Sequence, residues 1–113
     1  MSRIDFETIA MSLGGTVRFE GAEYDSPVSF FIGRNLPGEG ASKHRHPYAE
    51  TFVILEGEIE FIIDGELSLV GPGSITVAPA MAWHEFKNRS DRRCLTVNIH
   101  PVPEIIQENW VDR

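Results

Sequence analysis

Apolar and polar residues alternate most regularly between positions 58 and 70. Ile59, Phe61 and Ile63 fall on one face of an extended chain, and glutamates occupy the positions before and between the first two. Successive side chains of a strand point to opposite faces, so the pattern predicts a strand with one buried face. Asp64-Gly65 supplies residues that accept positive φ in a tight turn. The segment is therefore predicted to be a β-hairpin.

Segments of similar length recur along the chain, separated by clusters of Gly, Pro, Asn and Asp. Further strands are predicted at 16–19, 28–36, 74–78, 84–88 and 93–100. No α-helical periodicity of any length interrupts them, which is typical of an all-β sandwich or barrel. In the tail, Ile106 and Trp110 stand four residues apart, which allows either a short packed helix or an extended arm.

Two of these strands carry polar residues whose environment depends on the face they occupy. In 28–36, Arg34 shares a face with Val28, Phe30, Ile32 and Leu36. If that face is the barrel interior, Arg34 can meet an anionic group of a substrate; the alternative is a solvated guanidinium at the rim. His100 ends the last strand, directly before Pro101. We interpret His100 as a hydrogen-bonded histidine at a strand end rather than as a metal ligand.

Composition describes an ordinary globular protein. The chain of 113 residues is 42% hydrophobic and 24% charged, which predicts one domain with a core of its own. The net charge of -7 argues against a nucleic-acid partner, because phosphates would be repelled. Asp5 and Glu7 interrupt the apolar residues near the N-terminus, so no signal peptide is expected, and no apolar run is long enough for a membrane span. With a single cysteine, Cys94, the expected location is the cytoplasm.

Three histidines and a glutamate form the candidate site. His44 and His46 share a face of an extended chain, Glu50 lies an even number of positions further on, and His84 comes from a distant segment. An isolated His-x-His pair is also found as a packed or surface pair. Imidazole and carboxylate together suit Zn, Fe, Mn, Ni, Co or Cu, whereas Ca and Mg prefer shells made of oxygen alone. The four residues therefore predict one divalent transition metal, without selecting among the six.

The spacing around these residues resembles the two motifs of the cupin superfamily. The first motif is read as Gly, five residues, His44, one residue, His46, three residues, Glu50, six residues and Gly. The second has Gly, five residues, Pro, four residues, His84, three residues and Asn. One position departs from the family pattern, since Met81 stands where the family has glycine two residues after Pro79.

The resemblance implies a single cupin domain over 1–113, with its core barrel at about 28–100. The expected fold is all-β, a single-domain jelly-roll β-barrel, also called a double-stranded β-helix, with short N- and C-terminal extensions. Its interior would carry the metal on His44, His46, Glu50 and His84. The side chains expected around the pocket are Arg34, Tyr48, Met81 and Phe86. Tyr48, between ligands, is the candidate catalytic residue, with packing as its alternative role.

Two functions remain open at this level. The first is a metal-dependent enzyme acting on a small organic molecule, either dioxygenase-like or isomerase-like. The second is a barrel that binds or senses a small ligand without turnover. The metal-free sugar-nucleotide epimerase branch of the superfamily is a weaker alternative, because the ligand set is complete here. Thr51, Val53 and Leu55 lie opposite the Glu50 face of their strand. Since both faces of that strand need cover, a homodimer is expected.

Overall fold

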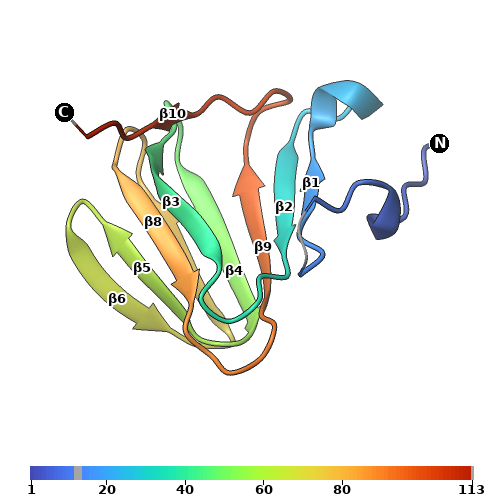
Figure 1. Cartoon of the computed structure of the whole chain (residues 1–113). Coiled ribbons are helices and arrows are strands. Elements are labelled where there is room, and N and C mark those ends of the chain that lie inside the picture. The colour runs from blue at the N-terminus through green and yellow to red at the C-terminus, as the bar shows by residue number, and fades with distance from the viewer. Residues whose placement is uncertain (12–13, 113) are drawn as a thin grey trace.

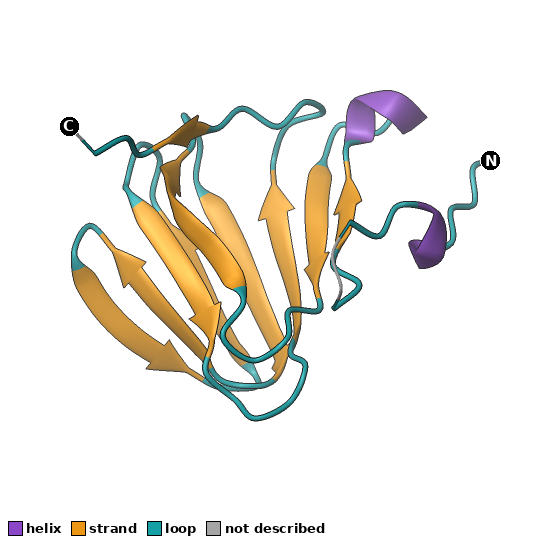
Figure 2. Ribbon diagram, viewed as in Figure 1, coloured by secondary structure: helices purple, strands orange, loops and turns teal. Residues whose placement is uncertain are grey.

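The computed structural model of the chain describes residues 1–11 and 14–112, and it is built almost entirely from strands (Figure 1). In chain order the strands are β1 (Val17–Phe19), β2 (Ser29–Gly33), β3 (Gly40–Arg45), β4 (Glu50–Glu56), β5 (Ile59–Ile63), β6 (Glu66–Val70), β7 (Ser74–Ala78), β8 (His84–Asn88), β9 (Leu95–His100) and β10 (Glu108–Asn109). Two short 3-10 helices, η1 (Phe6–Thr8) and η2 (Gly21–Tyr24), lie at the N-terminal side (Figure 2). Within the described residues, no helix is long and apolar enough to cross a membrane.

The strands form two five-stranded antiparallel sheets that face each other. One sheet has the order β1-β2-β9-β4-β7 and the other the order β10-β3-β8-β5-β6. Consecutive strands therefore alternate between the sheets at several points, as in a double-stranded β-helix. The predicted all-β jelly-roll fold is confirmed.

The hairpin of β5 and β6 has the predicted register and turn. Ile63 pairs with Glu66, so Asp64 and Gly65 are the only loop residues. Both have positive φ, 48° and 80°, as a two-residue turn between twisted strands requires. Phe61 faces the interior and packs against Phe52 of β4 with ring centroids 4.9 Å apart.

A compact apolar core lies between the sheets. Its buried members come from β4, β5 and β7 and from the segment before β9: Phe52, Ile54, Ile59, Phe61, Ala78 and Cys94. Phe86 of β8 packs against this core and also lines the cavity described below. The thiol of Cys94 is buried, and burial raises its pKa. Cys94 is thus a packing residue.

The inward faces of β2 and β9 carry mainly polar and small residues, where a simple strand pattern would place apolar ones. Ser29, Phe31 and Gly33 of β2 pair with His100, Asn98 and Thr96 of β9, and these are the positions that face inward. Phe30 and Ile32, which share the face of Arg34, lie on the outer side, so that face is not the barrel interior. Gly33 is required here, because a Cβ atom would come within 2.1 Å of Thr96 Oγ1. Alternation predicted which residues share a face, but both faces carry apolar side chains, so the face that turns inward was not determined.

The tail is an arm rather than a helix. Glu108 and Asn109 of β10 pair with Arg45 and His44 of β3. Trp110 packs edge-on against Trp83, with ring centroids 5.0 Å apart. In Figure 1 the arm crosses the end of the molecule where β3 and β4 meet. Together with β1, it extends the sheets beyond residues 28–100.

Candidate metal centre

The four predicted ligand residues lie together in the interior. His44 stands near the end of β3, His46 just beyond it, Glu50 begins β4 and His84 begins β8. One ligand atom from each of the four lies within 4.8 Å of the other three, and all four residues are buried. The antiparallel pairing of β3 with β8 places His44 directly opposite His84.

Backbone carbonyls fix the orientation of the three imidazoles. Nδ1 of His44 lies 2.6 Å from the carbonyl oxygen of Ser42, and Nδ1 of His46 lies 2.7 Å from that of Ile106. Nδ1 of His84 lies 3.0 Å from the carbonyl oxygen of Ala82. A carbonyl oxygen only accepts, so each Nδ1 carries the hydrogen and each neutral ring presents the lone pair of Nε2. Outer hydrogen bonds of this kind orient metal-bound histidines in proteins.

The donor set fits a transition-metal ion. Oε1 of Glu50 lies 3.0 Å from Nε2 of His46 and 3.1 Å from Nε2 of His84. Nε2 of His46 is fully buried and has no well-aligned hydrogen-bond partner. Buried polar atoms of native proteins are nearly always satisfied, and a metal ion at the focus of the cluster would satisfy this one. Three imidazole nitrogens and one carboxylate are donors that zinc, iron, manganese, nickel, cobalt and copper accept.

The electrostatics of the cluster favour a neutral ring at His44 and an ionised Glu50. Burial lowers the pKa of His44 to about 4. Burial raises the pKa of Glu50, but the neighbouring imidazoles of His100, His46 and His84 outweigh burial and bring the pKa well below its usual range. Burial lowers the pKa of His84, but the neighbouring Glu50 and the hydrogen bond to the Ala82 carbonyl outweigh burial, so its pKa is raised overall. The centre therefore holds a negative charge among imidazoles.

His100 is a part of the centre that the sequence analysis did not assign. Its Nε2 lies 3.1 Å from Oε2 of Glu50, the carboxylate oxygen that does not face His46 and His84. Its Nδ1 lies 2.6 Å from the hydroxyl of Tyr48. His100 is thus hydrogen-bonded at a strand end, as expected, but it also touches a predicted ligand. The available signal was its even spacing from Thr96 and Asn98 on one face of β9.

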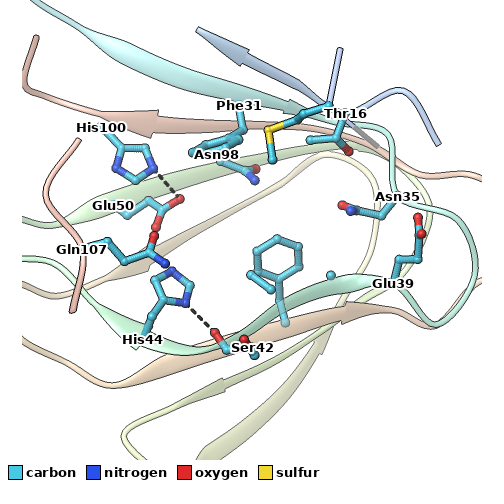
Figure 3. A pocket seen from close by; sticks show the side chains of 14 residues that line it. Thr16, Phe31, Asn35, Glu39, Ser42, His44, Glu50, Asn98, His100 and Gln107 are labelled. Carbon is cyan, nitrogen blue, oxygen red and sulfur yellow. Dashed lines mark hydrogen bonds and ion pairs between the residues drawn. The ribbon is translucent and has the colours of Figure 1, made fainter. Parts of the chain in front are cut away.

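A cavity of about 490 Å³ opens onto one side of the cluster (Figure 3). His44, Glu50 and His100 form one end of this cavity. The other lining residues are Met11, Thr16, Phe31, Asn35, Glu39, Gly40, Ala41, Ser42, Phe86, Asn98 and Gln107. Of the four side chains predicted around the pocket, only Phe86 lines it. Tyr48 lies behind His46 and His100, with its ring stacked on His46 at a centroid distance of 5.1 Å.

Arg34 and Met81 lie elsewhere, which corrects two expectations. Nε of Arg34 donates to the carbonyl oxygen of Gly15 at 2.8 Å, and its guanidinium lies over the ring of Phe6. Because β2 turns its other face inward, Arg34 points away from the cavity. Met81 has a φ of 65°, in the left-handed region that glycine adopts freely, and its side chain is 50% exposed. Its backbone N–H donates to the carbonyl oxygen of His46, so the turn keeps its shape despite the substitution.

Comparisons with known proteins agree with this architecture. A protein named polyketide synthase CurC from Streptomyces cyaneus is 37% identical over 73 residues, which cover 62% of this chain and 47% of that protein. A 5-nitrosalicylic acid 1,2-dioxygenase from Bradyrhizobium sp is 33% identical over 64 residues, covering 57% of this chain and 31% of that protein. The chain thus spans less than half the length of the curated relatives it matches.

The match to solved structures extends over nearly the whole chain. An uncharacterised conserved protein with a double-stranded β-helix domain from Klebsiella pneumoniae superposes with a TM-score of 0.73 at 18% identity, covering 95% of this chain and 89% of that one. Residues 34–100, more than half of the chain, match the sequence model of the family described as Cupin domain. With its two sheets, its cluster of His44, His46, Glu50 and His84 and this match, the chain belongs to the cupin domain family.

Proposed function

We propose that the protein is a metal-dependent enzyme that acts on a small organic molecule, by a dioxygenase-like or isomerase-like reaction. The observation that carries the proposal is the position of the cavity. Two of the four predicted ligands, His44 and Glu50, form part of its wall. A molecule in the cavity would therefore lie against the metal. A structural site, in contrast, would be closed by protein on all sides.

One divalent transition metal, held by His44, His46, Glu50 and His84, would supply a Lewis acid and, if it is redox-active, an electron-transfer centre. The protein contributes the rest. Backbone carbonyls hold the three imidazoles with Nε2 toward the ion, and His100 holds the second oxygen of Glu50. The aromatic rings of Phe31 and Phe86 line the cavity and exclude water from the face of a bound substrate.

The similarity to named enzymes supports this class of reaction. The 5-nitrosalicylic acid 1,2-dioxygenase shares 33% identity across the part of the chain that matches it. Relatives named gentisate dioxygenases from Aquipseudomonas alcaligenes and Ralstonia sp match at 40% and 30% identity. Oxygen chemistry on a small ring compound is therefore the first reaction type to screen. Isomerisation by a Lewis acid is the second.

The test begins with elemental analysis of protein purified without chelator or added metal. Wild type, His84→Ala and Glu50→Gln are compared with Glu66→Gln, a matched change at an exposed position. We expect near-stoichiometric metal in wild type and Glu66→Gln, and its loss in the other two. Iron, manganese, nickel, cobalt or copper would direct the screen toward oxygen uptake, and zinc toward isomerisation. Absence of metal from the wild type would contradict the proposal. Metal and ligand binding without turnover would favour a sensing barrel.

We also propose a cytoplasmic location for the protein. Its one cysteine, Cys94, is buried and takes no part in a disulfide. Reducing conditions would leave this fold unchanged. Fractionation of cells that express the full-length protein tests the location, and recovery from the periplasm or the medium would contradict it.

A further inference from the structure

Among the described residues, no lysine or arginine lies on the wall of the cavity. None of its 14 lining residues is Lys or Arg, and two of them, Glu39 and Glu50, are acidic. The nearby arginines are engaged elsewhere, since Arg34 donates to the carbonyl oxygen of Gly15 and Arg93 to that of Gly14. An anionic group on a substrate would therefore find no positive countercharge on the wall other than the metal.

Asn98 offers the cavity a directed hydrogen-bond donor. The residue is 4% exposed, and its Oδ1 accepts from Oγ1 of Thr96 at 2.9 Å. With Oδ1 on the Thr96 hydroxyl, the NH₂ group is the end that Figure 3 shows toward the cavity. Among the described residues that NH₂ group has no hydrogen-bond partner. This NH₂ group is accessible from the cavity, so it can donate to an acceptor on a bound molecule.

Asn35 repeats the arrangement further along the wall. It is 8% exposed, and its backbone carbonyl accepts hydrogen bonds from Asn88 and from the Cys94 amide. Its side-chain Oδ1 accepts only a long contact of 4.0 Å from the Cys94 thiol. Its side-chain NH₂ has no partner among the described residues. In Figure 3, Asn35 and Glu39 lie across the cavity from His44 and Glu50, with Asn98 between the two ends. Two amide donors therefore lie on the cavity wall away from the centre.

Glu39 adds negative charge at that far end. One of its oxygens accepts from the backbone N–H of Leu36 at 2.7 Å, and the other has no hydrogen-bond partner among the described residues. The carboxylates of Glu39 and Glu50 together balance the charge of a divalent ion. An additional carboxylate in the cavity would then meet a like charge without compensation, which costs binding free energy.

Apolar surface separates the two polar ends. Phe31 comes from β2 of one sheet and Phe86 from β8 of the other, so their rings line the cavity from two sides. Ala41 adds a small apolar side chain to the wall. A planar ring would be accommodated between these walls better than a flexible chain, because it buries apolar area at little cost in conformational entropy.

We propose that the substrate is an uncharged ring compound. It carries oxygen groups that reach the metal at one end and a carbonyl, amide or hydroxyl acceptor at the other, with no carboxylate at that second end. This inference rests on the proposed function, because it assigns the cavity to the substrate. It distinguishes the chain from an enzyme that recognises an aromatic acid through its carboxylate.

A matched pair of probes tests the charge preference. Protocatechuate has two adjacent ring hydroxyls and a carboxylate, and protocatechuamide is its neutral isostere. Binding of each to Zn²⁺-loaded protein is measured by calorimetry without oxygen, after the zinc content has been determined. We expect the amide to bind about tenfold more tightly than the acid. Glu39→Gln should narrow the difference in affinity between the two probes by strengthening the binding of the acid. Glu66→Gln should change neither affinity. Asn98→Leu should weaken the amide about tenfold and the acid less.

The outcomes separate the two proposals. Failure of the protein to retain zinc or any other transition metal would contradict the proposed function. Retained metal with tighter binding of the acid, or with equal affinities, would overturn only the uncharged substrate. Retained metal with no binding of either probe would overturn it as well. A preference for the amide that survives Asn98→Leu unchanged would show that Asn98 is not the donor and would contradict the assignment.

Discussion

The hydroxyl of Tyr48 lies 2.6 Å from Nδ1 of His100, and the two residues are 52 positions apart in the chain. The backbone N–H of Ile106 donates to the same hydroxyl at 3.4 Å, so the hydroxyl hydrogen is available to His100. His100 then carries its own hydrogen on Nε2, which lies 3.1 Å from Oε2 of Glu50. Its tautomer is opposite to that of the three predicted ligand histidines. His100 thus positions Glu50, and Tyr48 positions His100.

Replacing Tyr48 should therefore weaken metal binding without removing a ligand. Tyr48→Phe keeps the ring stacked on His46 but leaves Nδ1 of His100 without its partner. We expect the dissociation constant of the metal to rise about tenfold, as for other losses of outer hydrogen bonds around a metal site. Competition with a chromogenic chelator measures it. Tyr24→Phe is the matched control, because Tyr24 stacks on Phe19 far from the centre. An unchanged affinity in Tyr48→Phe would show that His100 does not position Glu50.

The metal-free protein should lose stability as the pH falls from about 6.5 to about 4. Burial depresses the pKa of His44 from its ordinary 6.5 to about 4, so in this window the unfolded chain binds a proton that the folded chain does not. The loss is of order 3 kcal/mol from this residue. Glu50, whose pKa is also lowered, adds to the loss below its ordinary value of 4.5.

His84 acts in the opposite sense. Its pKa is raised, so its contribution is complete below pH 6.5 and is lost as the pH rises through its folded value. Thermal unfolding of chelator-treated protein across this range should show a maximum near the ordinary histidine pKa. His44→Gln should flatten the acid side of the curve. A melting temperature that stays level or rises between pH 6.5 and 4 would be inconsistent with a buried neutral His44.

Met81→Gly should stabilise the fold. Met81 holds a left-handed backbone at φ 65°, and a residue with a Cβ atom pays for that conformation. Glycine removes the strain but costs entropy in the unfolded chain, so we expect a net gain of about 1 kcal/mol in the free energy of unfolding. Chemical denaturation measures it. Met81→Ala, which shortens the half-exposed side chain but keeps Cβ, should give no gain. Equal effects of the two substitutions would assign the change to the side chain instead.

A homodimer should form through the outer face of the sheet that contains β4. Ile75 and Val77 of β7 are 69% and 52% exposed, and they pair with Val53 and Thr51 of β4. Val97 and Ile99 of β9 continue this apolar face on the other side of β4. Light scattering at micromolar concentration should give the mass of two chains. Ile75→Lys with Val77→Lys should give one chain, whereas Leu67→Lys on the other sheet should not. A monomeric wild type would refute the dimer.

The strands at 74–78 and 84–88 and the hairpin turn were predictable because their signals are local. Turn residues and alternation set the bounds, and the spacing of His44, His46 and Glu50 places three side chains on one face. The contact of His100 with Glu50 was not predictable in the same way. It depends on which face of β9 turns inward, and that is decided by packing against β2 and β4 rather than by the alternation itself.

The cavity was harder to predict than the metal cluster. Asn35 and Asn98 belong to no motif, and amides on strands are found both at the surface and inside. Arg34 was the natural candidate for contact with a substrate because it is cationic. The positions of this segment that face inward include Asn35, so Asn35 lies on the cavity wall and its neighbour Arg34 lies outside. Which side chains line the cavity therefore depends on the face that each strand turns inward. The spacing of the metal ligands does not reveal that face for the other strands.

The arm of β10 matters for anyone who transplants or trims this domain. The carbonyl oxygen of Ile106 accepts a hydrogen bond from Nδ1 of His46, and the backbone N–H of Ile106 donates to the hydroxyl of Tyr48. Both groups lie beyond residue 100, where the match to the family ends. A recombinant fragment cut at the family boundary would keep all four ligand side chains but lose the backbone that selects the tautomer of one of them. Domain limits for chimaeras, libraries and display should be drawn after the arm.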